Sequence, residues 1–174
     1  GFFGSGKPWM WQHKGVAPDV VAFGKKAQVC GIYAGPRVDE VADNVFEKSS
    51  RINSTWGGTL VDMVRSRRFI ELIVEHGYCE SALHRGEQIL SGLRRIASET
   101  HAFGNVRGAG TLLAVDFETA ELRDKAVNAL FDKRLMALPC GDTSMRYRTP
   151  LNLEEGVADE ILNRTEEVAK KLRH

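Results

Sequence analysis

The sequence has almost no net charge and no long apolar run, and each of these absences excludes a class of protein. Its 24 basic and 23 acidic residues leave a formal net charge of +1, whereas nucleic-acid-binding domains usually carry a strong basic excess. No apolar run approaches the roughly 20 residues that a membrane span needs, and no signal peptide is visible. We therefore expect a cytoplasmic protein that binds neither nucleic acid nor a membrane.

Cysteine is also scarce. The three cysteines, Cys30, Cys79 and Cys140, are odd in number and far apart. This pattern is typical of reduced thiols and not of a disulfide framework or a metal site. The five histidines form no pair at ligand spacing, so no metal site is predicted.

The chain is long enough for one domain or a domain and a half, and its hydrophobic content of 43% can build a core. It begins without an initiator Met, inside the glycine-rich stretch GFFGSGKPW, and we expect it to be part of a longer chain. The spacing of GFFGSGK resembles a phosphate-binding loop, but Pro8 replaces the Ser or Thr that holds magnesium there. A nucleotide site is therefore the weakest hypothesis, and we expect a flexible surface loop.

Four segments in the first half carry apolar patterns. Residues Val20–Phe23 form a continuous apolar run, which is typical of a buried strand in a parallel sheet. Residues 37–46 place apolar side chains at helical spacing, and so do residues 60–76, where Gly77 follows as a C-terminal cap. A further helix is expected from about Cys79 to Glu99. Two long helices in succession indicate a connector between two lobes.

The second half alternates strands and helices. Three strands and two helices are expected, at residues 110–117, 135–138, 145–148, 121–133 and 152–172. Asn152 is the expected N-cap of the last helix, with Glu155 as its reciprocal partner. The order of elements indicates a compact α+β lobe within a chain of the α/β class.

A lysine stands where the first strand ends. In open α/β sheets, ligands bind beyond the carboxyl ends of strands, and Lys25 lies two residues after Phe23. Partial burial would lower the pKa of the Lys25 amine, because desolvation disfavours the charged form. A neutral amine can attack a carbonyl and form a Schiff base. Position alone favours an ordinary solvated lysine.

The residues around Lys25 also carry a family resemblance. The stretch APDVVAFGKK resembles the lysine segment of the class III, fold-type I pyridoxal-phosphate aminotransferases, which include the ornithine, acetylornithine and 4-aminobutyrate enzymes. In that family a Pro-Asp pair and a short apolar strand lead to the lysine that binds pyridoxal 5'-phosphate (PLP). The resemblance assigns this covalent role to Lys25 and not to its neighbour Lys26.

Two further stretches resemble the same family. NSTWGG (residues 53–58) is similar to a motif whose threonine reaches the cofactor phosphate of the other subunit, which assigns that role to Thr55. MRYRTPL (residues 145–151) is similar to a segment whose first arginine binds the substrate carboxylate, which assigns that role to Arg146. Alternation along the strand places Arg148 on the same side as Arg146, so periodicity alone does not separate them.

The resemblance implies a fold and a domain organisation. Residues 1–58 would be the tail of the large α/β cofactor domain, residues 59–77 a connecting helix, and residues 78–174 the small C-terminal α+β domain. In the family, the aspartate that pairs with the pyridine nitrogen and the loop that binds the phosphate lie upstream of the segment that starts at Gly1. The chain therefore resembles the C-terminal part of such an enzyme.

The resemblance also implies a reaction. Within the class, stretches such as VAFGKKAQVCG and RINSTWGG are most similar to the lysine 6-aminotransferases. These enzymes transfer the terminal amino group of L-lysine to 2-oxoglutarate, giving 2-aminoadipate 6-semialdehyde and glutamate, and a homodimer is expected because Thr55 would serve the neighbouring cofactor. The alternatives are a related enzyme that uses ornithine, acetylornithine or 4-aminobutyrate, and a fragment that does not catalyse the reaction alone.

Overall fold

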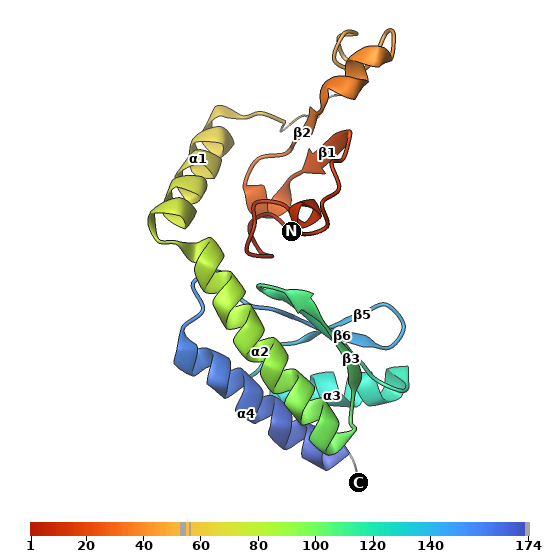
Figure 1. Cartoon of the computed structure of the whole chain (residues 1–174), viewed down its shortest axis with the longest axis vertical. Helices are drawn as coiled ribbons and strands as arrows, with labels where there is room; N and C mark the ends of the chain where they lie inside the picture. Colours follow the sequence, from red (N-terminus) through yellow and green to blue (C-terminus); the bar gives the residue numbers. More distant parts are fainter. Residues whose placement is uncertain (53–54, 56, 173–174) are drawn as a thin grey trace. The chain divides into compact units, whose positions relative to one another are not determined.

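The chain forms two compact units in the computed structural model, which describes residues 1–52, 55 and 57–172 (Figure 1). The first unit comprises Phe2 and Trp9–Gly77. The second unit comprises Gly1, Phe3–Pro8 and Tyr78–His174. The assignment of the predicted ranges to enzyme domains stays a prediction.

The first unit is built on a small antiparallel ribbon. Strand β1 (Val20–Phe23) pairs with β2 (Gly31–Ala34), and a 3₁₀ turn, η2 (Lys25–Ala27), follows β1. The rings of Trp9, Phe23 and Tyr33 pack against one another with centroids 5.5–6.3 Å apart. The strand at Val20–Phe23 is therefore confirmed. The expectation of a buried strand in a parallel sheet is wrong for the described residues, where β1 is half exposed and pairs antiparallel with β2 alone.

The helix expected at residues 37–46 does not form. A 3₁₀ turn, η3 (Pro36–Glu40), is followed by irregular turns. Asn44 causes the break, because its side-chain amide donates to the carbonyls of Val38 and Val41 and its oxygen accepts from the Phe46 N–H. Asparagine side chains compete with the helical backbone in this way, and the apolar spacing of the segment did not reveal it.

Helix α1 (Leu60–Glu75) lies where the sequence predicts a helix. Gly77 follows it with a φ of +62°, the left-handed conformation expected of a glycine just beyond a helix end. Its apolar face is largely exposed, however: Ile73 is buried, whereas Leu60, Val64 and Val74 are each more than 60% exposed. The apolar pattern of α1 predicts burial, but among the described residues most of this face is not covered.

The second unit has two layers, with helices on one face of a four-stranded antiparallel sheet (Figure 1). The strand order is β3-β4-β6-β5. The strands are β3 (Gly104–Ala109), β4 (Leu112–Asp116), β5 (Leu138–Cys140) and β6 (Ser144–Arg148), and the helices are α2 (Tyr78–Thr100), α3 (Ala120–Asp132) and α4 (Glu155–Leu172). The core fills the space between sheet and helices, where Leu93, Val115 and Tyr147 are at most 2% exposed.

The main differences from the predictions in this unit concern β3, β5 and the start of α4. Strand β3 was not predicted, because its sequence, GNVRGA, holds two glycines and little apolar alternation. The strand expected at 135–138 starts at Leu138 and includes Pro139, which an edge strand tolerates. Helix α4 starts at Glu155, so Asn152 lies too far upstream to be its N-cap.

The glycine-rich start is buried, which contradicts the expected flexible surface loop. Ser5 is fully buried and Phe3 is 7% exposed. The Gly4 carbonyl accepts hydrogen bonds from both the N–H and the hydroxyl of Thr111, at 2.7 and 2.9 Å. An added Cβ on Gly110 would lie 2.5 Å from that carbonyl oxygen. The loop is therefore an anchored part of the second unit.

Membrane-spanning helices and metal clusters are both absent from the described residues. None of the helices there combines the length and the apolar character that a membrane crossing requires. In the same part of the chain, no cluster of three or more His, Cys, Asp or Glu side chains could hold a metal ion.

Candidate active site

Lys25 lies in a strained turn directly after β1. Its φ is +55°, a left-handed conformation that side-chain-bearing residues adopt rarely. Such a conformation costs on the order of 1–3 kcal/mol and is concentrated at functional sites. The preceding Gly24 leaves room for this turn, since an added Cβ would lie 2.9 Å from the Cys30 sulfur. Lys25 is one of eight described non-glycine residues with a positive φ, and its sequence position alone did not predict this conformation.

The Lys25 side chain is exposed in this chain, not partly buried as expected. The turn lies at the end of a two-stranded ribbon, and its last residue, Ala27, is buried. Asp19, at the other end of β1, pairs with Arg37 through hydrogen bonds of 3.0 and 3.1 Å. Asp19 thus fixes the start of the strand through Arg37.

Thr55 lies in an exposed turn before α1. Gly57 and Gly58 follow, and Gly58 has a φ of +71°. Asn53, Ser54 and Trp56 of the predicted motif lie outside the described residues. Lys25 and Thr55 belong to the first unit and Arg146 to the second, so the three predicted residues are described in two separate settings.

Arg146 lies on the face of the sheet that is opposite the core, which we call the open face. Its neighbours along β6, Met145 and Tyr147, point the other way and are 1% and 2% exposed. The Nε atom of Arg146 is buried and has no hydrogen-bond partner. A buried donor without an acceptor costs about 1–3 kcal/mol. Among the described residues, no carboxylate pairs with Arg146, so its guanidinium can bind an anion.

The open face also carries a polar network beside Arg146. Asp116 accepts hydrogen bonds from Asn105, Arg107 and Ser144, at 2.6, 2.8 and 2.5 Å. Burial acts to raise the pKa of the Asp116 carboxyl, but these hydrogen bonds outweigh it and hold the pKa below its usual value. The sequence predicted none of these residues, since only the register of β3, β4 and β6 brings them together.

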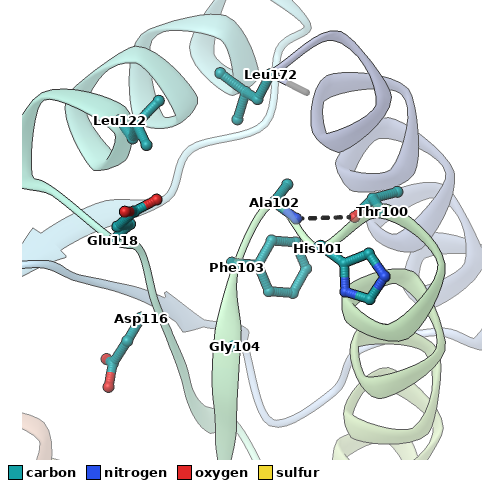
Figure 2. A pocket seen from close by; sticks show the side chains of 9 residues that line it. All are labelled: Thr100, His101, Ala102, Phe103, Gly104, Asp116, Glu118, Leu122 and Leu172. Carbon is teal, nitrogen blue, oxygen red and sulfur yellow. Dashed lines mark hydrogen bonds between the residues drawn. The ribbon is translucent and has the colours of Figure 1, made fainter. Parts of the chain in front are cut away.

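A pocket in the second unit lies outside the predicted site. It opens where α2 meets β3, and Figure 2 shows the hydrogen bond from the Ala102 N–H to the Thr100 hydroxyl beside it. Its lining residues are Thr100, His101, Ala102, Phe103, Gly104, Asp116, Glu118, Leu122 and Leu172. The Asp116 carboxylate in this lining is already paired with Arg107, so we assign the pocket no part in the site.

Sequence comparison decides the family. Residues 1–169 match the family described as aminotransferase class-III. The chain belongs to the class III aminotransferases. The class III resemblance predicted from three short stretches is therefore confirmed over almost the whole chain.

The chain is similar in sequence to several named members of this class. The L-lysine-epsilon aminotransferase of Mycobacterium tuberculosis is 44% identical over 156 residues, which are 89% of this chain and 35% of that protein. That of Streptomyces clavuligerus is 41% identical over 91% of this chain and 35% of its own length. The 4-aminobutyrate aminotransferase of Dictyostelium discoideum is 30% identical over 99% of this chain and 34% of its length. The class III chain thus spans about a third of these curated relatives.

A solved structure confirms the fold type. The lysine aminotransferase of M. tuberculosis in the internal aldimine form matches 99% of this chain with a TM-score of 0.91 and 40% identity, and the chain covers 40% of that protein. The class III chain therefore has the fold of the corresponding part of a fold-type I aminotransferase, as predicted.

The three predicted residues fit PLP and a carboxylate substrate chemically. Lys25 offers a primary amine that can condense with an aldehyde. The hydroxyl of Thr55 and backbone N–H groups beside glycines can donate to a phosphate. Arg146 offers a planar guanidinium whose buried Nε has no acceptor, and this group suits a carboxylate.

Proposed function

We propose that this chain is part of a PLP-dependent enzyme that transfers the terminal amino group of L-lysine to 2-oxoglutarate. The products are 2-aminoadipate 6-semialdehyde and glutamate. The observation that carries the proposal is the identity of 41–44% with L-lysine-epsilon aminotransferases, against 30% with a 4-aminobutyrate aminotransferase. Because the chain spans about a third of those relatives, activity, substrates and partners all belong to the proposal.

Lys25 holds the cofactor and moves the proton. Bound PLP supplies an aldehyde that condenses with amines and a ring that withdraws electrons from the neighbouring carbon. Lys25 would hold PLP through its amine, and when the substrate amine takes its place, Lys25 Nζ would take the proton from Cε of lysine and deliver it to the cofactor carbon. The left-handed turn at Lys25 supports this role.

Thr55 and Arg146 hold the two anionic groups. The Thr55 hydroxyl donates to the cofactor phosphate of the neighbouring subunit in a homodimer. Arg146 binds the α-carboxylate of lysine and a carboxylate of 2-oxoglutarate, which fixes the orientation of the reacting carbon. The unpartnered Nε of Arg146 supports this role, because a bound carboxylate would provide the acceptor that it lacks.

Covalent labelling tests the proposal. The protein is incubated with PLP, reduced with borohydride and digested, and the modified peptide is identified by mass spectrometry. We expect the label on Lys25, full loss in a Lys25→Ala variant, and retention in the matched Lys26→Ala variant. Equal labelling of many lysines would reject Lys25 as the cofactor lysine. A folded circular-dichroism spectrum without any label would favour a chain that does not act alone.

A further inference from the structure

The open face of the sheet places one aspartate diagonally next to two arginines. Arg107 on β3 and Arg146 on β6 both pair with Ala114 on β4, so the three residues form a row across the strands. Asp116 lies two residues further along β4, where it pairs with Ser144. Directly paired residues share a face of the sheet. Asp116 is therefore the diagonal neighbour of both arginines.

Strand register places both arginines at a similar distance from Asp116. A residue and its diagonal cross-strand neighbour lie about 7–8 Å apart between Cα atoms, which long side chains span. Ala114, the residue between the arginines, carries only a methyl group. By strand register alone, the Asp116 carboxylate can pair with either arginine.

Asp116 pairs with Arg107. The Arg107 guanidinium contacts Asp116 Oδ1 at 2.8 Å and donates to the Ser144 hydroxyl at 3.1 Å. Asn105 occupies Asp116 Oδ2 at 2.6 Å, so both carboxylate oxygens have donors. Arg146 forms no ion pair with a described carboxylate, and its buried Nε has no acceptor.

We propose that Arg107 is a positioning residue that keeps Arg146 free for the substrate carboxylate. By holding Asp116, Arg107 prevents this carboxylate from neutralising Arg146. This inference deepens the proposed function and rests on it, because it takes Arg146 as the carboxylate-binding group. Its consequence is specific: without the charge of Arg107, Asp116 becomes an internal competitor of the substrate's carboxylate.

A rescue experiment in the holoenzyme that contains this chain tests the inference. Arg107→Gln keeps a donor but loses the charge, and we expect it to weaken glutarate, an unreactive dicarboxylate, by about fivefold, the size of a partly exposed ion pair. The KM for lysine should rise similarly, whereas the KM for 1,5-diaminopentane, which lacks the carboxylate, should not. The double variant Arg107→Gln/Asp116→Asn should recover glutarate binding, because the amide introduced by the second substitution carries no charge to compete.

The outcomes separate this inference from the proposed function. Equal weakening of lysine and 1,5-diaminopentane, or a double variant that binds glutarate no better than Arg107→Gln, would indicate a structural role for Arg107 and overturn the inference. Arg94→Gln removes an exposed, ion-paired arginine of α2 and serves as the matched control. If Arg146→Ala leaves glutarate binding unchanged, the carboxylate role of Arg146 in the proposed function fails instead.

Discussion

An arginine nitrogen that is buried without an acceptor is the most informative single atom in the second unit. Arg146 and Arg148 point to the same face of β6, but Arg148 is exposed and Arg146 is not. Water can solvate the exposed guanidinium, whereas the buried Nε of Arg146 gains an acceptor only from a ligand or a partner. This difference favours Arg146 over Arg148, which strand alternation left open.

The first prediction compares these two arginines. We expect Arg146→Ala to weaken carboxylate substrates by about 1.5–3 kcal/mol, the range for hydrogen bonds to charged groups, and Arg148→Ala to change them by less than about 1 kcal/mol. The measurement is KM for lysine and 2-oxoglutarate in the holoenzyme. A larger effect at Arg148, or no effect at Arg146, would show that the assignment is wrong.

The residues of the site divide into those that the sequence could reveal and those that it could not. Lys25, Thr55 and Arg146 lie in short stretches whose sequences resemble motifs of the family, so they could be named without a structure. Their roles stay predictions. Arg107 and Asp116 lie nine residues apart on different strands, and only the β3–β4 register joins them. The strained φ of Lys25 likewise depends on the turn that follows β1 and has no signal in composition.

At the level of elements, the buried N-terminal loop depends on a glycine in the turn between β3 and β4. Gly110 has a φ of +55°, and an added Cβ would lie 2.5 Å from the Gly4 carbonyl oxygen. We expect Gly110→Ala to destabilise the second unit by about 2–3 kcal/mol, because both the backbone conformation and the close approach oppose a side chain. Urea unfolding followed by circular dichroism measures the change.

The matched control for this substitution is Gly156→Ala in α4. Nothing lies within 4 Å of an added Cβ there, and alanine favours a helix over glycine by up to about 1 kcal/mol. Gly156→Ala should therefore be neutral or stabilising. If both variants unfold at the same urea concentration, the loop does not depend on the close approach at Gly110.

A charged network between α2 and α4 predicts how the second unit responds to acid. Hydrogen bonds from Arg95 and Lys170 lower the pKa of Glu166 from 4.5 to about 2. A folded-state pKa below the unfolded value stabilises the fold above pH 4.5, and this stability is lost as the pH falls from 4.5 towards 2. Glu166→Gln should reduce the free energy of unfolding by about 1 kcal/mol at pH 7 and have little effect near pH 2.

Unfolding of Glu166→Gln across this pH range checks the prediction. Glu118→Gln, at an exposed carboxylate, is the control and should leave the pH dependence unchanged. A wild-type and a Glu166→Gln protein whose stabilities differ equally at pH 7 and pH 2 would exclude the network as the source of acid sensitivity.

Sequence periodicity predicted the long elements of the fold better than the short ones. Helix α2 lies within a residue of its predicted bounds at each end, because its apolar side chains at 3.6-residue spacing are buried against the sheet. The helix expected at residues 37–46 failed because one side chain, Asn44, caps the backbone within the segment. Strand β3 was missed because pairing with β4, and not its own composition, makes it a strand.

At the scale of the whole molecule, the exposed apolar face of α1 and the greater length of the relatives both raise the question of what buries this face in the assembled protein. The chain covers 35% of the M. tuberculosis relative, and Leu60, Val64 and Val74 on α1 are exposed. The sequence patterned these residues for burial, and the described chain alone does not bury them. An experiment on the assembled dimer therefore tests the proposed function most directly.

Hybrid dimers test whether Thr55 serves the cofactor of the other subunit. A subunit with Lys25→Ala is mixed with one carrying Thr55→Ala, and hybrids are isolated by two affinity tags. If Thr55 acts across the dimer, the intact Lys25 is paired with the intact Thr55 of the other subunit. Its site should then retain PLP as the wild type does, while the Thr55→Ala homodimer loses PLP on dialysis. Hybrids that lose PLP as fast as that homodimer would place Thr55 at the cofactor of its own subunit, because each Lys25 would then depend on the threonine of its own chain.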